Sequence, residues 1–167
     1  MNPFIGTASD MNPSSPYPAG PLLQAIDSPA DLRRLERGAL KRVADELRRF
    51  VAQASWIAVN DYEGKMLCDR TGWTLAEMSQ QVRGLIVTLG AEGCEVWEQG
   101  ASTKVAPVKP AQVVDPTGCG DAWRGGLLYG LEKGWPLVRC AQLGNRLGAL
   151  KIAQRGPQNY ALDFTPD

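Results

Sequence analysis

The stretch from residue 113 to residue 126, VVDPTGCGDAWRGG, constrains this chain most, because it places glycines between two acids and directly ahead of an apolar segment with helical spacing. Glycines such as Gly118 and Gly120 adopt backbone conformations that other residues disfavour, and they let a ligand approach the main chain. We expect a helix to begin near Asp121. The amides of Gly118, Cys119 and Gly120 would then stand unpaired at its N-terminus. The stretch therefore predicts a turn and a helix whose first amides are free to bind an anion.

Asp121 is predicted to stand at the edge of this anion site. A carboxylate there opposes phosphate binding, so its presence suggests a chemical role, such as taking a proton from a hydroxyl that attacks the phosphate. The alternative is structural, with Asp121 as an ordinary N-cap and the glycines as a tight turn, since glycine-rich turns before helices are common. The stretch contains neither GxxxxGK[ST] nor GxGxxG, so it is neither a Walker A loop nor a dinucleotide fingerprint.

The composition is that of a globular chain of 167 residues, of which 44% are hydrophobic. The formal net charge is zero, so we expect no binding to nucleic acid. The chain has no apolar run long enough to span a membrane and no basic and apolar leader, so we expect no membrane association and a cytoplasmic location. Histidine is absent and no cysteines form a CxxC pair, which excludes a His-based triad and disfavours zinc. The cysteines are Cys68, Cys94, Cys119 and Cys140.

Two segments of different composition make up the N-terminal part. Residues 1–30 mix prolines with Ser, Asn and Gly and show no apolar periodicity, so we expect an irregular or mobile arm, or else a strand-poor piece packed on the domain. Residues 31–52 form a basic amphipathic helix region, in which apolar residues recur every three or four positions and Gly38 divides two helices. Such a helix can bind nucleic acid or membrane, but it is more often a solvated surface helix.

The apolar run Trp56–Val59 predicts a buried strand that ends at Asn60. A helix to about Arg70, with Gly72 as its C-cap, is expected to follow. Asn60 and Glu63 are three residues apart, so one helical turn places both side chains on the same side. Amide and carboxylate oxygens are hard ligands that suit Mg²⁺ through its water shell. The simpler interpretation of this pair is an N-cap with an acid in the first turn.

Short apolar runs and turns alternate in the middle of the chain. The sequence TLAE, which starts at Thr74, is a capping box and predicts a helix to about Arg83. Residues 85–89 predict a buried strand, residues 90–93 a turn, and residues 94–106 a hairpin.

The last third begins with a proline-containing loop and a short strand at residues 113–114. Helices are expected from Asp121 to about Lys133 and from Leu137 to Gln154. Glycines inside the first of these helices cost about 1 kcal/mol each relative to alanine, which suggests that they are kept for close backbone packing. These glycines are Gly125, Gly126 and Gly130.

Residues 115–126 closely resemble the second signature of the ribokinase-like (PfkB) carbohydrate and nucleoside kinases, which usually reads D-T-x-G-A-G-D-x-F-x-G-[GA]. Cys119 stands where alanine is usual, and Pro116 where threonine is common. The sequence NDYE at Asn60 matches the N-x-x-E motif of that family, and residues 88–93 resemble its nucleotide-side turn. The resemblance covers about residues 56–158 and looks closest to the bacterial branch of adenosine and sugar kinases.

The resemblance implies an α/β fold, a ribokinase-like three-layer sheet with helices on both faces. Residues 53–167 would form its C-terminal, nucleotide-binding half. It also implies ATP-dependent phosphorylation of the hydroxymethyl group of a sugar or nucleoside, with Mg²⁺ and a monovalent cation such as K⁺ as cofactors. Asp121 would be the general base, and the amides of Gly118, Cys119 and Gly120 would hold the charge of the transferring phosphate. The other implied site residues are Thr88, Gly90, Gly93 and Asn145 for the nucleotide, Asn60 and Glu63 for Mg²⁺ through water, and Asp115 for the monovalent cation. As a thiol at a helix N-terminus, Cys119 is expected to be acidified.

One departure from the family concerns length, because complete members are nearly twice as long and we find no acceptor-binding motif or β lid in residues 1–50. We therefore expect a truncated kinase, or alternatively a nucleotide-binding remnant that serves as an interaction module. Missing strands would expose a sheet edge, which favours a homodimer or a complementing chain.

Overall fold

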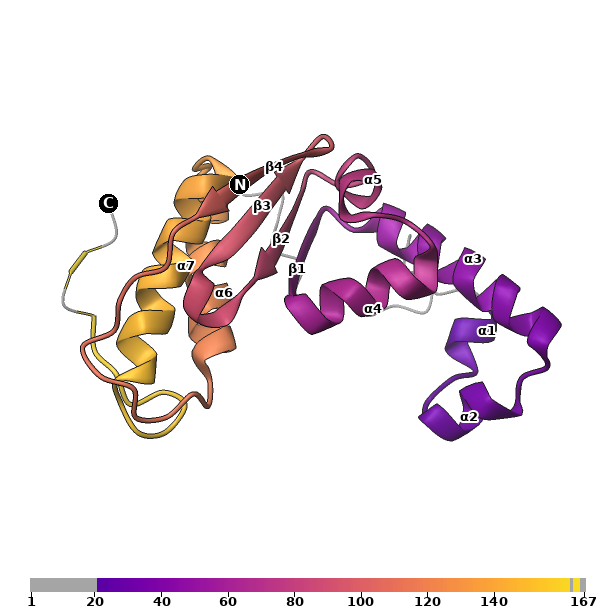
Figure 1. The fold of residues 1–167 in the computed structure, drawn as a ribbon, viewed down its shortest axis with the longest axis horizontal. Helices are drawn as coiled ribbons and strands as arrows, with labels where there is room; N and C mark the ends of the chain where they lie inside the picture. The colour runs from indigo at the N-terminus through magenta and orange to yellow at the C-terminus, as the bar shows by residue number, and fades with distance from the viewer. Residues whose placement is uncertain (1–20, 163, 166–167) are drawn as a thin grey trace.

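The computed structural model describes residues 21–162, 164 and 165 of the chain. Helices and strands alternate along it, as expected for an α/β protein (Figure 1). The elements in chain order are α1 (Pro21–Gln24), α2 (Pro29–Arg34), α3 (Arg37–Gln53), β1 (Trp56–Asn60), α4 (Asp61–Thr71), α5 (Leu75–Ser79), β2 (Gly84–Thr88), the 3₁₀ turn η2 (Gly90–Glu92), β3 (Cys94–Glu98), β4 (Ala101–Val105), α6 (Cys119–Glu132) and α7 (Leu137–Ile152).

Strands β1 to β4 form one sheet in the order of the sequence. β1 and β2 are parallel, with Trp56 opposite Gly84 and Asn60 opposite Thr88. β3 and β4 are added as an antiparallel hairpin whose turn is at residues 99–100, as predicted. The parallel pairing brings the carboxyl ends of β1 and β2 to the same edge of the sheet.

β2 is the centre of the core, because its residues are buried on both faces of the sheet. Successive side chains of a strand point to opposite faces. Ile86 accordingly packs in a cluster with α6 and α7, whereas Leu85 and Val87 pack in a second cluster with α3 and α5. Figure 1 shows α6 and α7 on one face and α3, α4 and α5 on the other. The predicted α/β fold, with helices on both faces of a sheet, is confirmed.

α6 and α7 pack with their backbones in close contact at glycines. A Cβ atom on Gly126 would lie 2.8 Å from the amide nitrogen of Gly144, and one on Gly130 would lie 2.6 Å from the Sγ atom of Cys140. The expected role in close packing is therefore confirmed for these two glycines of α6. It is wrong for Gly125, which has open space where a Cβ would be.

One element in the middle of the chain differs from the sequence expectation. α5 ends at Ser79 and does not reach Arg83. The hydroxyl of Ser79 accepts a hydrogen bond from the amide of Gly100 at 2.9 Å, and the amide of Arg83 already donates to the carbonyl of Ser55 at 2.9 Å. Contacts to distant segments therefore end this helix early.

The short strand expected at residues 113–114 does not form. The amides of Val114 and Asp115 donate to the carbonyl of Ile152, at 2.8 and 3.2 Å, so they bond to the end of α7 and to no strand. The side chain of Val113 is also exposed. The loop before α6 is thus held by a helix end, a contact that local sequence does not reveal.

The N-terminal region contains more helix than expected. Residues 1–20 of the predicted arm lie outside the described residues, but its remainder contains α1. The break between α2 and α3 falls at Leu35 and Glu36, where Glu36 has an extended backbone, and Gly38 lies in the first turn of α3. Within the described residues no helix is long and apolar enough to cross a membrane.

Candidate functional site

The N-terminus of α6 is built by the glycine-rich turn. Gly118 is the N-cap with φ of +81°, and its carbonyl accepts the first helical hydrogen bond from the amide of Ala122 at 2.9 Å. The amides of Gly118 and Gly120 have no partner among the described residues. The amide of Cys119, which we expected to be free, donates to the carbonyl of Pro116 at 3.1 Å. The helix end therefore presents the amides of the two glycines to an anion, and that of Cys119 only if the turn opens.

Gly118 and Gly120 are glycine for different reasons. A Cβ atom on Gly118 would lie 2.8 Å from the carbonyl oxygen of Pro157, and the left-handed backbone disfavours any other residue. A Cβ atom on Gly120 would meet only the guanidinium of Arg124, at 3.4 Å. The fold thus requires the first glycine, while the second leaves open space at the helix end in which a ligand could approach the main chain.

Asp121 is exposed beside this space, with 85% of its side chain accessible. Its nearest cation is Arg124, one turn further along α6, whose Nη1 atom lies 3.6 Å from Oδ1. A carboxylate that solvent reaches can accept a proton from a bound hydroxyl, and a neighbouring guanidinium can offset phosphate charge. Arg124 was not among the predicted site residues, although its spacing of three residues from Asp121 indicates that the two side chains lie on one side of the helix.

Asp115 ties the loop before α6 to the turn after α7. Its Oδ1 atom accepts a hydrogen bond from the amide of Thr117 at 2.9 Å, and its Oδ2 atom accepts one from the amide of Gly156 at 2.8 Å. These two hydrogen bonds lower the pKa of Asp115 from 3.8 to about 2. The carboxylate therefore fixes the position of the turn from which α6 starts.

Lys151 was not among the predicted site residues, although it contacts the loop that carries the signature. Its side chain is completely buried, and its Nζ atom donates to the carbonyls of Asp115 at 2.7 Å and Gln154 at 3.1 Å. The signal was a lysine four residues after Leu147, on the apolar stripe of α7. A buried cation thus lies directly behind the loop that carries the signature.

Cys119 does not behave as the acidified thiol that we expected. Burial raises the pKa of its thiol above the usual value, the nearby charge of Lys151 opposes that rise, and Asp115 adds to it. Its Sγ atom also lies 3.9 Å from the carbonyl oxygen of Asp115. Desolvation of this half-buried thiol is thus the largest cause of the shift, and it acts against acidification.

Asn60 and Glu63 form a complete capping box at the start of α4. The Oδ1 atom of Asn60 accepts from the amide of Glu63 at 2.7 Å, and the Oε2 atom of Glu63 accepts from the amide of Asn60 at 3.0 Å. Asn60 is exposed and Glu63 is half-buried, and Asn60 is opposite Thr88 at the carboxyl edge of the parallel strands. In Figure 1 this edge and the N-terminus of α6 both point to the lower side of the view.

The residues expected to contact the nucleotide have different surroundings. Thr88 is half-buried and lies 3.4 Å from the carbonyl of Val59, while Gly90 has a positive φ and open space around it. At Gly93 a Cβ would clash with the carbonyl of Val105 at 2.3 Å, so this glycine is required by the hairpin. Of the three, Gly90 leaves most room for a ligand.

Asn145 is a buried structural residue. Its Oδ1 atom accepts from the indole of Trp123 at 2.8 Å, and its Nδ2 atom donates to the carbonyl of Ala106 at 2.9 Å. With 8% of its surface accessible, it joins α7 to α6 and to the loop after β4. The side-chain amide is thus occupied by the protein, and a contact with adenine would require these hydrogen bonds to be exchanged.

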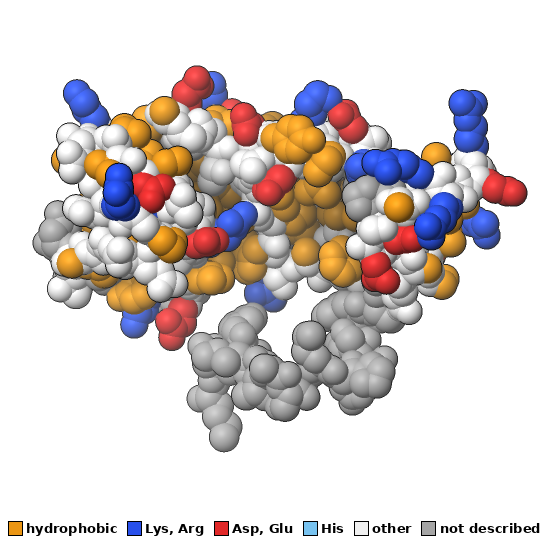
Figure 2. Space-filling model, turned by 90° about the horizontal axis from the view of Figure 1, so that it is seen from below, with side chains coloured by type: hydrophobic (Ala, Val, Ile, Leu, Met, Phe, Trp, Pro, Cys, Tyr) orange, Lys and Arg blue, Asp and Glu red, His pale blue; other side chains and the backbone are white. Residues whose placement is uncertain are grey.

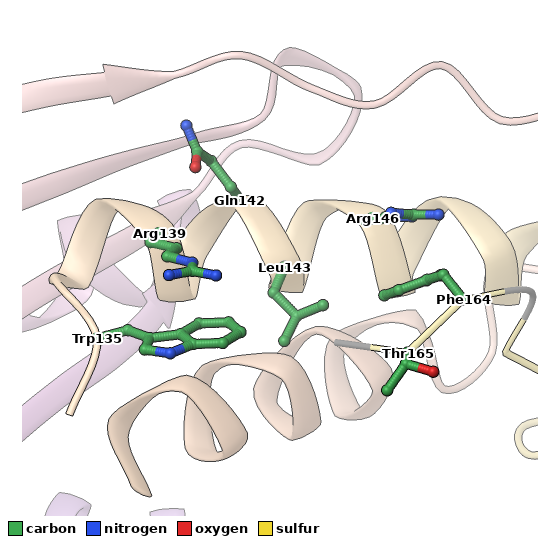
Figure 3. A pocket seen from close by; sticks show the side chains of 7 residues that line it. All are labelled: Trp135, Arg139, Gln142, Leu143, Arg146, Phe164 and Thr165. Atoms are coloured by element: carbon green, nitrogen blue, oxygen red, sulfur yellow. The ribbon is translucent and has the colours of Figure 1, made fainter. Parts of the chain in front are cut away.

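Two surface depressions lie along α7, with volumes of about 280 and 160 Å³. Figure 3 shows the larger one, where Arg139 lies over the ring of Trp135 and Arg146 over the ring of Phe164. Neither depression is lined by Asp121 or by the glycines before it. The helix end, where 85% of the Asp121 side chain is accessible, is therefore separate from both depressions.

Comparison with known proteins shows the family of the chain. Residues 23–163 match the pfkB family of carbohydrate kinases, which is most of the chain. The chain belongs to this family. It is 25% identical over 112 residues to a nucleoside kinase of Methanocaldococcus jannaschii, covering 67% of this chain and 37% of that protein. It is 32% identical over 118 residues to an uncharacterised sugar kinase of Archaeoglobus fulgidus, covering 70% and 47% respectively.

Solved structures of pfkB-type kinases have the same fold. The structure of Burkholderia thailandensis nucleoside kinase in complex with inosine is 47% identical, with a TM-score of 0.68, and the match covers 71% of this chain and 39% of that one. The same kinase in complex with ADP-inosine gives a TM-score of 0.68 at 45% identity, and covers 74% and 39%. The chain thus spans less than half the length of the kinases to which it is similar.

The Mg²⁺ that a pfkB kinase implies fits the described residues only through water. No cluster of three or more His, Cys, Asp or Glu residues exists in the described part that could hold a metal directly. Glu63 uses Oε2 in the capping box, which leaves its Oε1 atom for contact with a hydrated ion. Asn60 and Glu63 would therefore orient the water shell of Mg²⁺, which neutralises phosphate charge when it is bound.

The monovalent cation does not fit at Asp115. Both carboxylate oxygens accept backbone amides, and the backbone carbonyl accepts the ammonium of Lys151 at 2.7 Å. A second cation at this carbonyl would lie against a like charge, with which it would not share the position. We therefore derive no role for K⁺ in this protein.

Proposed function

We propose that this chain is the phosphoryl-transfer half of an ATP-dependent pfkB-type kinase that phosphorylates a hydroxymethyl group. The observation that carries the proposal is the N-terminus of α6, where unpaired amides, the open space at Gly120 and an exposed carboxylate meet. A helix N-terminus attracts phosphate, and a carboxylate at its edge has a chemical purpose when a hydroxyl must lose a proton there.

Each residue has one role in the proposed reaction. Asp121 accepts the proton of the attacking hydroxyl, a contribution of about 10²–10⁴ in rate. The amides of Gly118 and Gly120 hold the negative charge of the transferring phosphate, and one such donor contributes about 10²–10³. Arg124 lies beside Asp121 and offsets phosphate charge. Gly90 and Thr88 border the nucleotide at the carboxyl edge of β2.

We propose a nucleoside as the acceptor, ahead of a simple sugar. The support is that the Burkholderia thailandensis relative, whose solved complexes contain inosine, is 47% identical over the matched part. In both cases the proposed acceptor is a primary hydroxyl group, so the role of Asp121 is the same.

A second candidate function is nucleotide binding without catalysis. The observation in its favour is that the match covers only 39% of the solved nucleoside kinase. Turnover then requires that a second copy or another chain supply the acceptor site, whereas nucleotide binding requires only the helix end. The two functions differ in whether ADP forms.

The test is ADP production by the purified chain with Mg·ATP, scanned over inosine, adenosine, cytidine, ribose and fructose. We expect acceptor-dependent turnover that Asp121→Asn lowers by at least 10²-fold. Asp69→Asn is the matched control, since Asp69 forms only a surface ion pair with Lys65 in α4. Turnover by Asp121→Asn at the wild-type rate would contradict the role of the base. Nucleotide binding without turnover for any acceptor would favour the second function.

A further inference from the structure

Lys151 is an unusual residue for the interior of a small domain. It is completely buried near the end of α7 and is the largest of the fully buried side chains in the described residues. Burial of an ammonium group is costly unless each of its donors finds a partner. No carboxylate lies within ion-pair distance of its Nζ atom among the described residues. The partners are instead main-chain oxygens, those of Asp115 and Gln154, at 2.7 and 3.1 Å.

Two segments converge on this ammonium. The signature loop contributes the carbonyl of Asp115, and the turn after α7 contributes that of Gln154. The carboxylate of Asp115 accepts the amide of Gly156, so the turn is held to the loop a second time. In Figure 1 the end of α7 and the loop before α6 lie together at the lower left.

These surroundings are those of a monovalent cation site. Main-chain carbonyl oxygens replace the hydration shell of ions such as K⁺, and one carboxylate in the vicinity balances a single positive charge. Here the carbonyl oxygens are directed at an ammonium group, which also carries one positive charge. The charge of Lys151 is also near enough to lower the pKa of Asp115, although the backbone hydrogen bonds contribute more.

We propose that the ammonium group of Lys151 replaces a bound monovalent cation, so that the signature loop is held in place without K⁺. The ammonium group belongs to a side chain of α7, so unlike a bound ion it does not dissociate. The loop that it holds continues through Thr117 into Gly118, so the position of the α6 N-terminus depends on Lys151. This inference concerns the stability of the loop and stands whether or not the chain turns over ATP.

The wild-type chain gives the first test. Its thermal unfolding is measured in KCl, NaCl and tetramethylammonium chloride at equal ionic strength. We expect the same melting temperature in all three salts. A saturable increase that is specific to K⁺ would show an exchangeable cation site and would overturn the proposal.

The variant Lys151→Ala gives the second test, because it opens a space next to the carbonyls of Asp115 and Gln154. We expect it to be less stable than the wild type and to recover stability specifically in KCl or ammonium chloride, and not in tetramethylammonium chloride. Lys104→Ala, on the exposed surface of β4, is the matched control and is expected to show no such recovery. A folded Lys151→Ala variant with no preference among these salts would contradict the proposal. If the variant folds in none of them, the result for the wild-type chain decides.

Discussion

Gly118 and Gly120 are separated by one residue, yet the protein itself requires only the first to be glycine. Gly118 has a left-handed backbone and lies against Pro157, whereas nothing but the mobile end of Arg124 approaches the position of a Cβ on Gly120. The sequence shows two equivalent glycines. The structure separates one that shapes the turn from one that leaves room for a ligand.

Because of Asp115, we expect the stability of the protein to fall at acidic pH. The pKa of Asp115 is lowered from 3.8 to about 2 in the folded protein. The contribution of its carboxylate to stability is therefore fully present above pH 3.8 and is lost as the pH falls through about 2. We expect the urea midpoint of Asp115→Asn to lie below that of the wild type at about pH 5, and the difference to shrink as the pH approaches 2. The measurement is urea unfolding followed by tryptophan fluorescence. A difference that stays constant over this range would show that the charge of Asp115 is not responsible.

Cys119 is expected to react slowly with alkylating agents. Because burial raises the pKa of its thiol, the fraction of thiolate at neutral pH is smaller than in a free cysteine. We expect alkylation of Cys119 by iodoacetamide to be slower than that of N-acetylcysteine, with the rate measured for this residue by peptide mass spectrometry. Faster alkylation would indicate that the helix end dominates over burial.

At the scale of elements, α4 and α5 begin with the same capping box, but only the glutamate of α4 is also proposed to contact hydrated Mg²⁺. Glu63 in α4 and Glu77 in α5 each accept the amide of their N-cap residue, at 3.0 and 2.8 Å. Glutamine retains an acceptor oxygen but has no charge. We expect Glu63→Gln and Glu77→Gln to change the free energy of unfolding by no more than about 0.5 kcal/mol each.

Only Glu63→Gln is expected to weaken the affinity for Mg·ADP, since only this carboxylate is proposed to orient hydrated Mg²⁺. The measurement is calorimetric titration of Mg·ADP, with Glu77→Gln as the matched control. Equal affinities of the two variants would leave Glu63 with its capping role alone.

Elements with strong local signals were predictable from sequence. The apolar runs of β1 and β2, the TLAE box of α5 and the C-cap at Gly72 are all found where they were expected. The errors occur where distant contacts decide. α5 ends early through the hydrogen bond of Ser79 to Gly100, and residues 113–114 bond to the end of α7 instead of forming a strand.

The candidate site was predictable in part for the same reason. Its glycines and Asp121 are adjacent in sequence and form one turn, which motif analysis can recognise. The ammonium of Lys151 meets Asp115 from 36 residues away, and only the folded chain brings them together. In our proposal this ammonium takes the place of the monovalent cation that the family resemblance implied at Asp115.

At the scale of the molecule, the sheet has an open edge at β1, which pairs only with β2 among the described strands. Figure 2, which views the molecule from the side of the α6 N-terminus, shows hydrophobic side chains gathered near the centre. Tyr62 and Val113 are among the exposed large hydrophobic residues, with 71% and 72% of their surfaces accessible. An unpaired strand edge and an apolar surface favour association with another chain.

We therefore expect the purified chain to self-associate as its concentration rises. Sedimentation equilibrium over a range of concentrations measures this directly. A mass that remains monomeric at every concentration would show that the β1 edge is protected, or that only a different chain can pair with it.

The central claim is that the N-terminus of α6 binds the phosphates of a nucleotide, and titration of Mg·ADP into three chains tests it most directly. Gly120→Ala places a methyl group in the open space at the helix end, whereas Gly125→Ala places one in open space further along the same helix. Both changes favour helix, so both variants are expected to fold. We predict wild-type affinity for Gly125→Ala and a loss of about tenfold or more for Gly120→Ala, since a lost hydrogen bond to a charged group costs about 1.5–3 kcal/mol. Equal affinity of all three chains would contradict the claim.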